Sequence, residues 1–158
     1  MTLRIGSGYD VHAFTPDRPL ILGGVNIPFE LGLAGHSDAD TVIHAIVDAL
    51  LGAAALGDIG QHFSPGDIRW KDQPSYIFLD HTLDLLCQQS WSIVNIDTTI
   101  VAERPRMGPH IQSMREHLAG HLKLSIDQVS VKATTTDKLG FAGRGEGIAC
   151  YAVALIER

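Results

Sequence analysis

Residues 37–56 read SDADTVIHAIVDALLGAAAL and form a long pattern of helical type. Within it, apolar side chains recur at helical spacing, so one face of the predicted helix is apolar. These positions are Val42, Ile46, Ala49, Leu50 and Ala53. Ser37 or Asp38 is a suitable N-cap residue, and the pattern predicts a helix from there to about Leu56.

The flanking segments predict a mixture of short strands and helices. A Gly-Gly turn at residues 23–24 joins the strands of a hairpin over 20–27, and Gly6 and Gly8 interrupt a strand over 3–11. Alternating apolar residues predict further strands at 94–102, 129–133 and 148–156. Apolar residues at helical spacing predict two more helices, at 75–89 and 111–122. Loops are expected at 57–74 and 139–147.

This order of elements predicts one α+β domain that spans residues 1–158. Its helices can cover only one face of a small mixed sheet, which gives a two-layer sandwich. The last strand carries apolar residues on both of its faces, such as Val153, Leu155 and Ile156. We therefore expect the second face of the sheet to be buried against another subunit.

Composition excludes several classes of protein. Hydrophobic residues make up 45% of the chain and charged residues 19%, which is not a disordered composition. No apolar run approaches the roughly 20 residues that a bilayer span requires, and the N-terminus lacks an apolar signal stretch. A formal charge of -6 without a basic stripe argues against nucleic acid or an anionic membrane as partner. We expect a soluble cytoplasmic protein whose cysteines, Cys87 and Cys150, are reduced packing residues.

Three residues form a candidate metal site. Asp10 and His12 are two residues apart in a strand, so both side chains point to one side, although a solvated strand end would look the same. His44 lies among apolar residues of the predicted helix, as a hydrogen-bonded core histidine or as a ligand. This set suits zinc or another divalent first-row metal and leaves one coordination position open for catalysis. Asp40 or Asp48, each four residues from His44, could accept a hydrogen bond from its other ring nitrogen, or could cap or solvate the helix.

Two further segments carry groups that suit phosphate. His36 and Ser37 precede the long helix, whose first N–H groups favour an anion, although Ser37 can equally be only an N-cap. Hydroxyl groups follow the strand at 129–133, and Asp137 beside them can hold Mg²⁺ or Mn²⁺ together with substrate phosphates. These hydroxyl residues, for which simple β-structure is the alternative explanation, are Thr134, Thr135 and Thr136.

Three other segments offer less specific contacts. Carboxylates and close backbone approach in the loop at 57–74 suit polyol hydroxyls, and an ordinary exposed turn is the alternative. The residues concerned are Asp58, Ile59, Gly60, Phe63, Ser64, Pro65, Gly66 and Asp67. A planar base could fit the backbone edge formed by Ala102, Glu103, Arg104, Pro105, Arg106, Met107 and Gly108. The glycine-rich loop at 143–147 presents one cation, Arg144, and is too irregular for a P-loop.

In combination, four blocks of sequence resemble the 2-C-methyl-D-erythritol 2,4-cyclodiphosphate synthase family, from about Arg4 to Leu155. The blocks are GYDVH at 8–12, AGHSDAD at 34–40, AAALGDIG at 53–60, and the segment 131–147. The resemblance implies conversion of 4-diphosphocytidyl-2-C-methyl-D-erythritol 2-phosphate into the cyclic diphosphate with release of CMP, in the non-mevalonate route to isoprenoids. The 2-phosphate attacks the β-phosphorus of the same molecule. The resemblance also implies a homotrimer with active sites between adjacent subunits.

The resemblance implies roles for individual residues. Zinc ligands correspond to Asp10, His12 and His44, and positions that stabilise the transition state correspond to His36 and Thr135. Contacts with methylerythritol phosphate correspond to Ser37, 58–60 and 63–67. Contacts with cytidine and the diphosphate correspond to 102–108 and 134–137, and further ligand positions to Phe141 and Arg144. In some members, the residues matching Arg144 and Glu146 lie near a central trimer cavity that can hold an isoprenoid diphosphate.

Two positions depart from the family pattern. Asp137 stands where glutamate is common, and its shorter side chain would need a bridging water or a small backbone shift to reach a second metal. Arg106 stands where lysine is common, which keeps the charge but changes the geometry of the donors.

Two other functions fit the same residues. A metal-dependent phosphohydrolase would use the same three ligands and would need a base to activate water, for which His36 is the obvious candidate. A metal-stabilised trimeric protein that binds isoprenoid diphosphates would show metal-dependent folding without turnover. For the synthase, the loop at 60–74 is the expected lid that keeps water from the phosphates.

Overall fold

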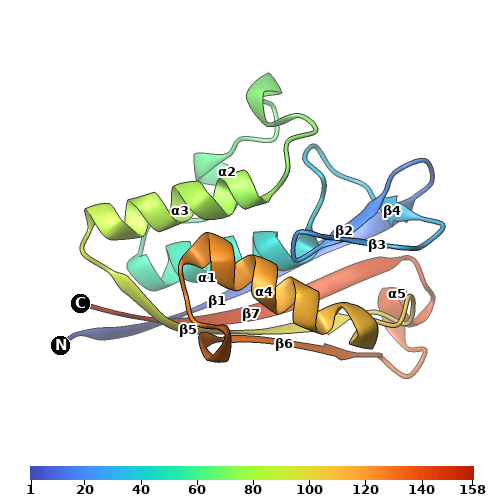
Figure 1. Ribbon diagram of the computed structural model, residues 1–158. Coiled ribbons are helices and arrows are strands. Elements are labelled where there is room, and N and C mark those ends of the chain that lie inside the picture. The colour runs from blue at the N-terminus through green and yellow to red at the C-terminus, as the bar shows by residue number, and fades with distance from the viewer.

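A mixed five-stranded sheet forms the base of the molecule in the computed structural model, which describes residues 1–158 (Figure 1). Its strands are β1 (Leu3–Thr15), β4 (Gly32–Leu33), β5 (Ser92–Val101), β6 (Val129–Thr134) and β7 (Gly147–Glu157). They lie in the order β4-β1-β7-β5-β6, with β5 and β6 parallel and all other neighbours antiparallel. The predicted α+β class and mixed sheet are confirmed.

The longer helices lie on one face of this sheet, as predicted (Figure 1). They are α1 (Thr41–Ala54), α2 (Ile59–His62), α3 (Tyr76–Gln88), α4 (Ile111–Leu122) and α5 (Gly140–Gly143), with short 3₁₀ turns at Ile68–Trp70, Gly108–His110 and Ile126–Gln128. α1 packs across β1 and β7, α4 packs on β6, and α3 packs mainly against α1 and α4. The two segments predicted as loops therefore contain short helices, α2 and α5.

The predicted hairpin is present beside the main sheet. Its strands are β2 (Leu20–Leu22) and β3 (Val25–Ile27), and the two turn residues, Gly23 and Gly24, both have positive φ. A pair of residues with positive φ is what a two-residue hairpin turn of the right twist requires, and glycine adopts that conformation without steric cost.

β1 is continuous, although the sequence predicts that its glycines interrupt it. A Cβ on Gly6 would lie 2.0 Å from the backbone oxygen of Ala49, and a Cβ on Gly8 would lie 1.9 Å from that of Ala45. The glycines thus permit α1 to lie directly against the strand. This close approach brings His44 of α1 to the strand residues that were predicted to share a metal with it.

α1 begins at Thr41, and its N-cap is Asp40 rather than Ser37 or Asp38. The Asp40 carboxylate accepts hydrogen bonds from the first N–H groups of α1 and from the two glycine N–H groups of the β2–β3 turn. Burial of this carboxylate and the nearby charge of Asp38 raise the pKa of Asp40 to about 6. Since the Asp40 side chain already binds these N–H groups, they are not available to an anion, and the phosphate contacts of His36 and Ser37 stay a prediction.

The opposite face of the sheet carries no helix (Figure 1). Apolar side chains are exposed along β1 and β7, and they are Leu3, Ile5, Tyr9, Val11, Tyr151 and Val153. Tyr9 and Tyr151 are cross-strand partners whose ring centroids lie 4.7 Å apart. The sequence correctly predicts an apolar second face, and the subunit that would cover it stays a prediction.

The two cysteines differ in their exposure to solvent. Cys150 is buried in β7, whereas Cys87 is exposed on α3 and is not a core residue. None of the helices combines the length and the apolar character that crossing a bilayer demands. The cytoplasmic location stays a prediction.

Candidate metal centre and active site

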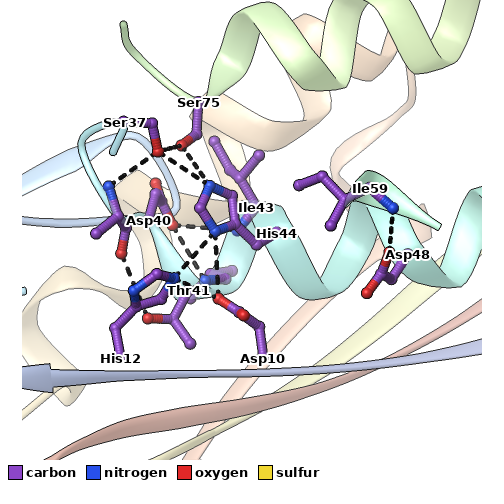
Figure 2. Close-up of polar contacts among 12 residues, drawn as sticks. Asp10, His12, Ser37, Asp40, Thr41, Ile43, His44, Asp48, Ile59 and Ser75 are labelled. Carbon is purple, nitrogen blue, oxygen red and sulfur yellow. Dashed lines mark hydrogen bonds and ion pairs between the residues drawn. The ribbon is translucent and has the colours of Figure 1, made fainter. Parts of the chain in front are cut away.

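Asp10 and His12 of β1 converge with His44 of α1 (Figure 2). His12 Nε2 lies 3.0 Å from Asp10 Oδ2, and His44 Nδ1 lies 3.2 Å from both of these atoms. A tetrahedral zinc ion with ligands at about 2.0–2.1 Å separates its ligand atoms by about 3.3–3.4 Å. The three side chains are thus close enough together to share a single divalent metal ion, and two nitrogens with one carboxylate oxygen are a donor set that zinc accepts.

The other ring nitrogen of each histidine is also bound. His12 Nδ1 donates to the carbonyl oxygen of Ala34 at 2.5 Å, which leaves Nε2 free to bind a metal. His44 Nε2 lies 2.9 Å from Ser75 Oγ (Figure 2). Such partners orient the imidazole of a metal-binding histidine.

The aspartates predicted to serve His44 in this way do not do so. Asp40 caps α1, and Asp48 Oδ1 accepts the N–H of Ile59 at 2.7 Å (Figure 2). The sequence correctly places Asp48 on the helix, whereas Asp40 is the N-cap that precedes it, and Ser75 was missed because it lies at the start of another helix. No local pattern would have pointed to it.

Charge in the site favours a bound cation. Burial raises the pKa of the Asp10 carboxyl, but hydrogen bonds with His12 and His44 outweigh this and hold the pKa well below its usual range. Burial lowers the pKa of His12, and the hydrogen bond to Asp10 outweighs it, so that the net shift is upward. An ionised carboxylate beside two imidazoles favours a proton on an imidazole. By the same electrostatics it favours a metal ion bound among the three side chains.

A pocket of about 330 Å³ opens beside the three ligands. Seven of the residues predicted to contact substrate line it, and they are His36, Ser37, Ile59, Gly60, Phe63, Ser64 and Pro65. Trp70 and Phe78 also line it and were not predicted. The ring of Phe63 lies 4.5 Å from that of Phe78 and 5.4 Å from that of Trp70, measured between centroids. The one sequence feature that could have indicated this aromatic wall is Trp70, a tryptophan in a loop rich in glycine, proline and aspartate.

Three predicted residues of the same loop lie outside this pocket, namely Asp58, Gly66 and Asp67. Asp58 caps α2 by accepting the N–H of Gln61 at 3.0 Å. Asp67 accepts hydrogen bonds from the backbone and the guanidinium of Arg69. Both carboxylates therefore have structural partners within the loop.

Arg18, which the sequence analysis did not single out, holds one wall of the pocket. Its Nη1 donates to the carbonyl oxygen of Gly35 at 2.6 Å, and its Nη2 donates to that of Ser37. These two bonds clamp the segment that carries His36. A single cation near a loop gives no sequence signal for such a role.

A second pocket, of about 370 Å³, lies at the carboxyl ends of β5 and β6. Parallel pairing of the two strands ends with Val101 opposite Thr134, so the segments that follow them begin at the same sheet edge. Glu103 Oε1 joins these segments by accepting the N–H groups of Thr136 and Lys138, each at 3.1 Å. The predicted residues that line this second pocket are Thr134, Thr135, Thr136 and Phe141.

The two pockets share no residue. The remaining predicted residues line neither of them, and they are Ala102, Glu103, Arg104, Pro105, Arg106, Met107, Gly108, Asp137 and Arg144. Asp137 is exposed, with φ of 56°, and Arg144 pairs with Glu146 at 2.7 Å. Within one chain, the metal-binding half and the threonine-rich half of the predicted site are thus separate.

Known proteins of one family are similar to almost the whole of this chain. The model of the YgbB family matches residues 3–157. A 2-C-methyl-D-erythritol 2,4-cyclodiphosphate synthase from Geobacter sulfurreducens is 59% identical over 155 residues, which cover 98% of this chain and 99% of that protein. The bifunctional IspDF from Campylobacter jejuni has a TM-score of 0.95 at 39% identity, over 98% of this chain but 42% of that longer chain. A 2C-methyl-D-erythritol-2,4-cyclodiphosphate synthase in a CDP-bound form has a TM-score of 0.90 at 33% identity, over 98% of this chain and 100% of that chain.

Proposed function

Because the chain belongs to the YgbB family, we propose that it closes the ring of 2-C-methyl-D-erythritol 2,4-cyclodiphosphate in the non-mevalonate isoprenoid pathway. The substrate is 4-diphosphocytidyl-2-C-methyl-D-erythritol 2-phosphate. An oxygen of its 2-phosphate bonds to the β-phosphorus, and the bond from that phosphorus to the oxygen bridging to the α-phosphate breaks. The bridging oxygen leaves with CMP, so the reaction needs neither water nor a protein nucleophile.

The observation that carries this proposal is the meeting of Asp10, His12 and His44 at the wall of a pocket. When bound, Zn²⁺ or another divalent first-row metal at these ligands would supply Lewis-acid polarisation of a phosphoryl oxygen, and Mg²⁺ or Mn²⁺ at Asp137 would supply further positive charge. A net charge of -6 cannot attract an anionic substrate by itself, so local positive charge is required.

The chain's own residues bind and orient the substrate. Holding the 2-phosphate near the β-phosphorus in one molecule makes the attack intramolecular, which removes much of the entropic barrier. His36 and the hydroxyl of Thr135 donate hydrogen bonds to phosphoryl oxygens as charge develops on them. The rings of Phe63, Trp70 and Phe78 form an apolar wall that limits access of water to the reacting phosphates.

The two halves of the molecule bind different parts of the substrate. Ser37 and the segments 58–60 and 63–67 contact methylerythritol phosphate. Segments 102–108 and 134–137, with Phe141, contact cytidine and the diphosphate. A CDP-bound structure among the relatives supports a cytidine subsite of this kind.

The functional unit is a homotrimer in which the two pockets come from adjacent subunits. The apolar sheet face supports this arrangement, because Tyr9 and Tyr151 on that face also line the threonine-rich pocket. A neighbour packed on this face would therefore lie next to that pocket. Arg144 and Glu146 would lie near a central cavity able to hold an isoprenoid diphosphate.

The test is ³¹P NMR of the protein with the diphosphocytidyl substrate, Zn²⁺ and Mg²⁺. The expected products are the cyclic diphosphate and CMP in equal amounts. Linear phosphates with CMP would instead identify a phosphohydrolase in which water attacks. No reaction by metal-loaded protein would contradict the synthase and favour a protein that only binds isoprenoid diphosphates.

A further inference from the structure

His44 has different surroundings at its two ring nitrogens. Nδ1 faces Asp10 and His12, at 3.2 Å from each of their ligand atoms. Nε2 faces two serine hydroxyls, 2.9 Å from Ser75 Oγ and 3.2 Å from Ser37 Oγ (Figure 2). Ser75 is completely buried and the His44 side chain nearly so. A hydroxyl can donate or accept, so the geometry at Nε2 alone leaves the tautomer of His44 undecided.

Asp38 decides the direction of this hydrogen bond. Ser75 Oγ also contacts Asp38 Oδ1, and the backbone N–H of Ser75 donates to Asp38 Oδ2 at 3.0 Å. An ionised carboxylate can only accept, so the hydroxyl proton of Ser75 is directed to Asp38. Ser75 Oγ is then an acceptor toward His44, so Nε2 carries a proton, and a metal ion can take the place of the contact between Nδ1 and Asp10 Oδ2.

Ser75 is also unusual for a residue in its position. It is the N-cap of α3, where serine commonly accepts a hydrogen bond from the first turn, yet its side chain makes no capping bond. The hydroxyl is turned toward Asp38 and His44 instead. The Ser75 hydroxyl thus does not cap its own helix and instead contacts residues more than thirty positions away in sequence. This indicates a role outside the helix.

We infer that Ser75, held by Asp38, is a positioning residue that keeps His44 in the Nε2–H tautomer and presents the Nδ1 lone pair to the metal. This inference rests on the proposed metal role of Asp10, His12 and His44. Partners of this kind typically change metal affinity by about 10–100-fold when they are removed. Ser37 has a lesser role, because its hydroxyl is farther from Nε2 and contacts no carboxylate.

The same contacts connect the metal site to the loop at 57–74. The N–H of Asp38 donates to the carbonyl oxygen of Gln73 at 3.1 Å, and the N–H of Asp72 donates to that of His36 at 2.7 Å. The end of the loop is thus bound to the segment that carries Asp38. Ser75 follows directly, so the backbone contacts of Asp72 and Gln73 help to set its place beside His44.

The test is zinc affinity, measured by competition with a chromogenic chelator on the purified full chain. Ser75→Ala and Ser75→Cys are expected to raise the zinc Kd about 10–100-fold, because neither offers a strong acceptor to Nε2–H. Thr82→Val is the matched control, since it removes another buried hydroxyl from α3 that bonds only to the carbonyl oxygen of Phe78. Its zinc Kd is expected to equal that of the unmodified chain.

A second variant tests the direction of the proton. Asp38→Asn places a donor beside Ser75, so the serine hydroxyl can turn and donate to Nε2. We expect ¹⁵N spectra of His44 to show a proton on Nε2 in the unmodified chain and a proton on Nδ1 alone, which faces Asp10, in Asp38→Asn. A role in folding alone would not move this proton.

The outcomes separate this inference from the proposed function. An unmodified chain that binds no zinc would overturn both the metal centre and the inference. An unmodified chain that binds zinc, together with Ser75→Ala protein that binds it equally well, would overturn the inference only. A His44 Nε2 that carries no proton in the unmodified chain would overturn it as well.

Discussion

Gly8 of β1 lies against the backbone oxygen of Ala45 in α1, and a Cβ on Gly8 would be 1.9 Å from that oxygen. Ala45 directly follows His44, and Gly8 lies two residues before Asp10. The contact that sets the spacing between strand and helix is therefore next to the residues that we propose as metal ligands. Any change in this spacing moves the ligands apart.

Gly8→Ala should destabilise the fold and weaken metal binding together. Because the clash is with backbone, no side chain can rotate away, and we expect a cost of about 3 kcal/mol, at the upper end for overpacking. Urea unfolding and zinc titration measure the two effects. Gly52→Ala is the control, since its Cβ would lie 3.9 Å from the nearest atom outside the helix, and alanine favours helix by about 1 kcal/mol. Equal stability of the two variants would contradict this account.

His44→Ala should abolish stoichiometric zinc binding and nearly all turnover, because only two of the three ligands remain. Metal content by mass spectrometry and CMP release by chromatography measure the losses. His121→Ala is a suitable control, since His121 pairs with Asp80, lies outside the metal cluster and its pocket, and should leave zinc content unchanged. Full activity in a metal-depleted His44→Ala protein would rule out the mechanism.

Asp137→Asn should weaken the dependence of activity on Mg²⁺ more than it lowers the zinc content. The Asp137 carboxylate is exposed and makes no hydrogen bond or ion pair within the chain, so it is free to hold a second metal. Titration of activity with Mg²⁺ at constant zinc measures the effect. An unchanged Mg²⁺ titration would show that Asp137 is not a ligand.

Arg18→Ala should lower kcat/KM while the protein stays folded. Its two hydrogen bonds to Gly35 and Ser37 hold the segment that carries His36, and loss of a charged donor typically costs about 1.5–3 kcal/mol. Solvent near the guanidinium reduces this, so we expect a loss of about tenfold. Arg18→Lys should recover only part of it, because one ammonium cannot span both carbonyls as the guanidinium does. Unchanged kinetics in both variants would show that the clamp has no role in catalysis.

The dependence of stability on pH should report Asp40. Its pKa is raised to about 6 in the folded chain, against about 3.9 for an unfolded aspartate. Between these values the folded state binds more protons than the unfolded state, so this group's contribution to stability falls as pH rises from about 4 to about 6. Asp40→Asn removes this contribution. The difference in unfolding free energy between the two proteins should therefore change by about 2–3 kcal/mol across the window, and a constant difference would contradict the assignment.

Local patterns in the sequence predicted most of the secondary structure and the metal ligands. Helical periodicity located α1, α3 and α4, and alternation located β5, β6 and β7, because these periods follow from backbone geometry alone. The Asp-x-His spacing placed two ligands on one side of a strand for the same reason. The alternation in the last strand also predicted that the second face of the sheet is apolar. In each case a few neighbouring residues contain all the information needed.

Predictions from the sequence were wrong where a residue contacts a partner that is distant in the sequence. Glycines in β1 suggested that the strand is interrupted. They instead allow the backbone of α1, about forty positions away in sequence, to pack closely against the strand. Ser37 and Asp38 suggested a cap, but Asp40 caps the helix because it also binds the turn of the β2–β3 hairpin. Asp48 suggested a partner for His44, but α2 begins beside it and uses its carboxylate.

The sequence by itself determined which residues are chemically equipped for the reaction, since residue type and spacing along one element are local properties. Only the tertiary structure decided which of them meet. Ser75 reaches His44 across 31 residues, and the metal pocket stays separate from the threonine-rich pocket within one chain. Contacts of this kind depend on how whole elements pack, and packing is a sum over many side chains that no short motif records.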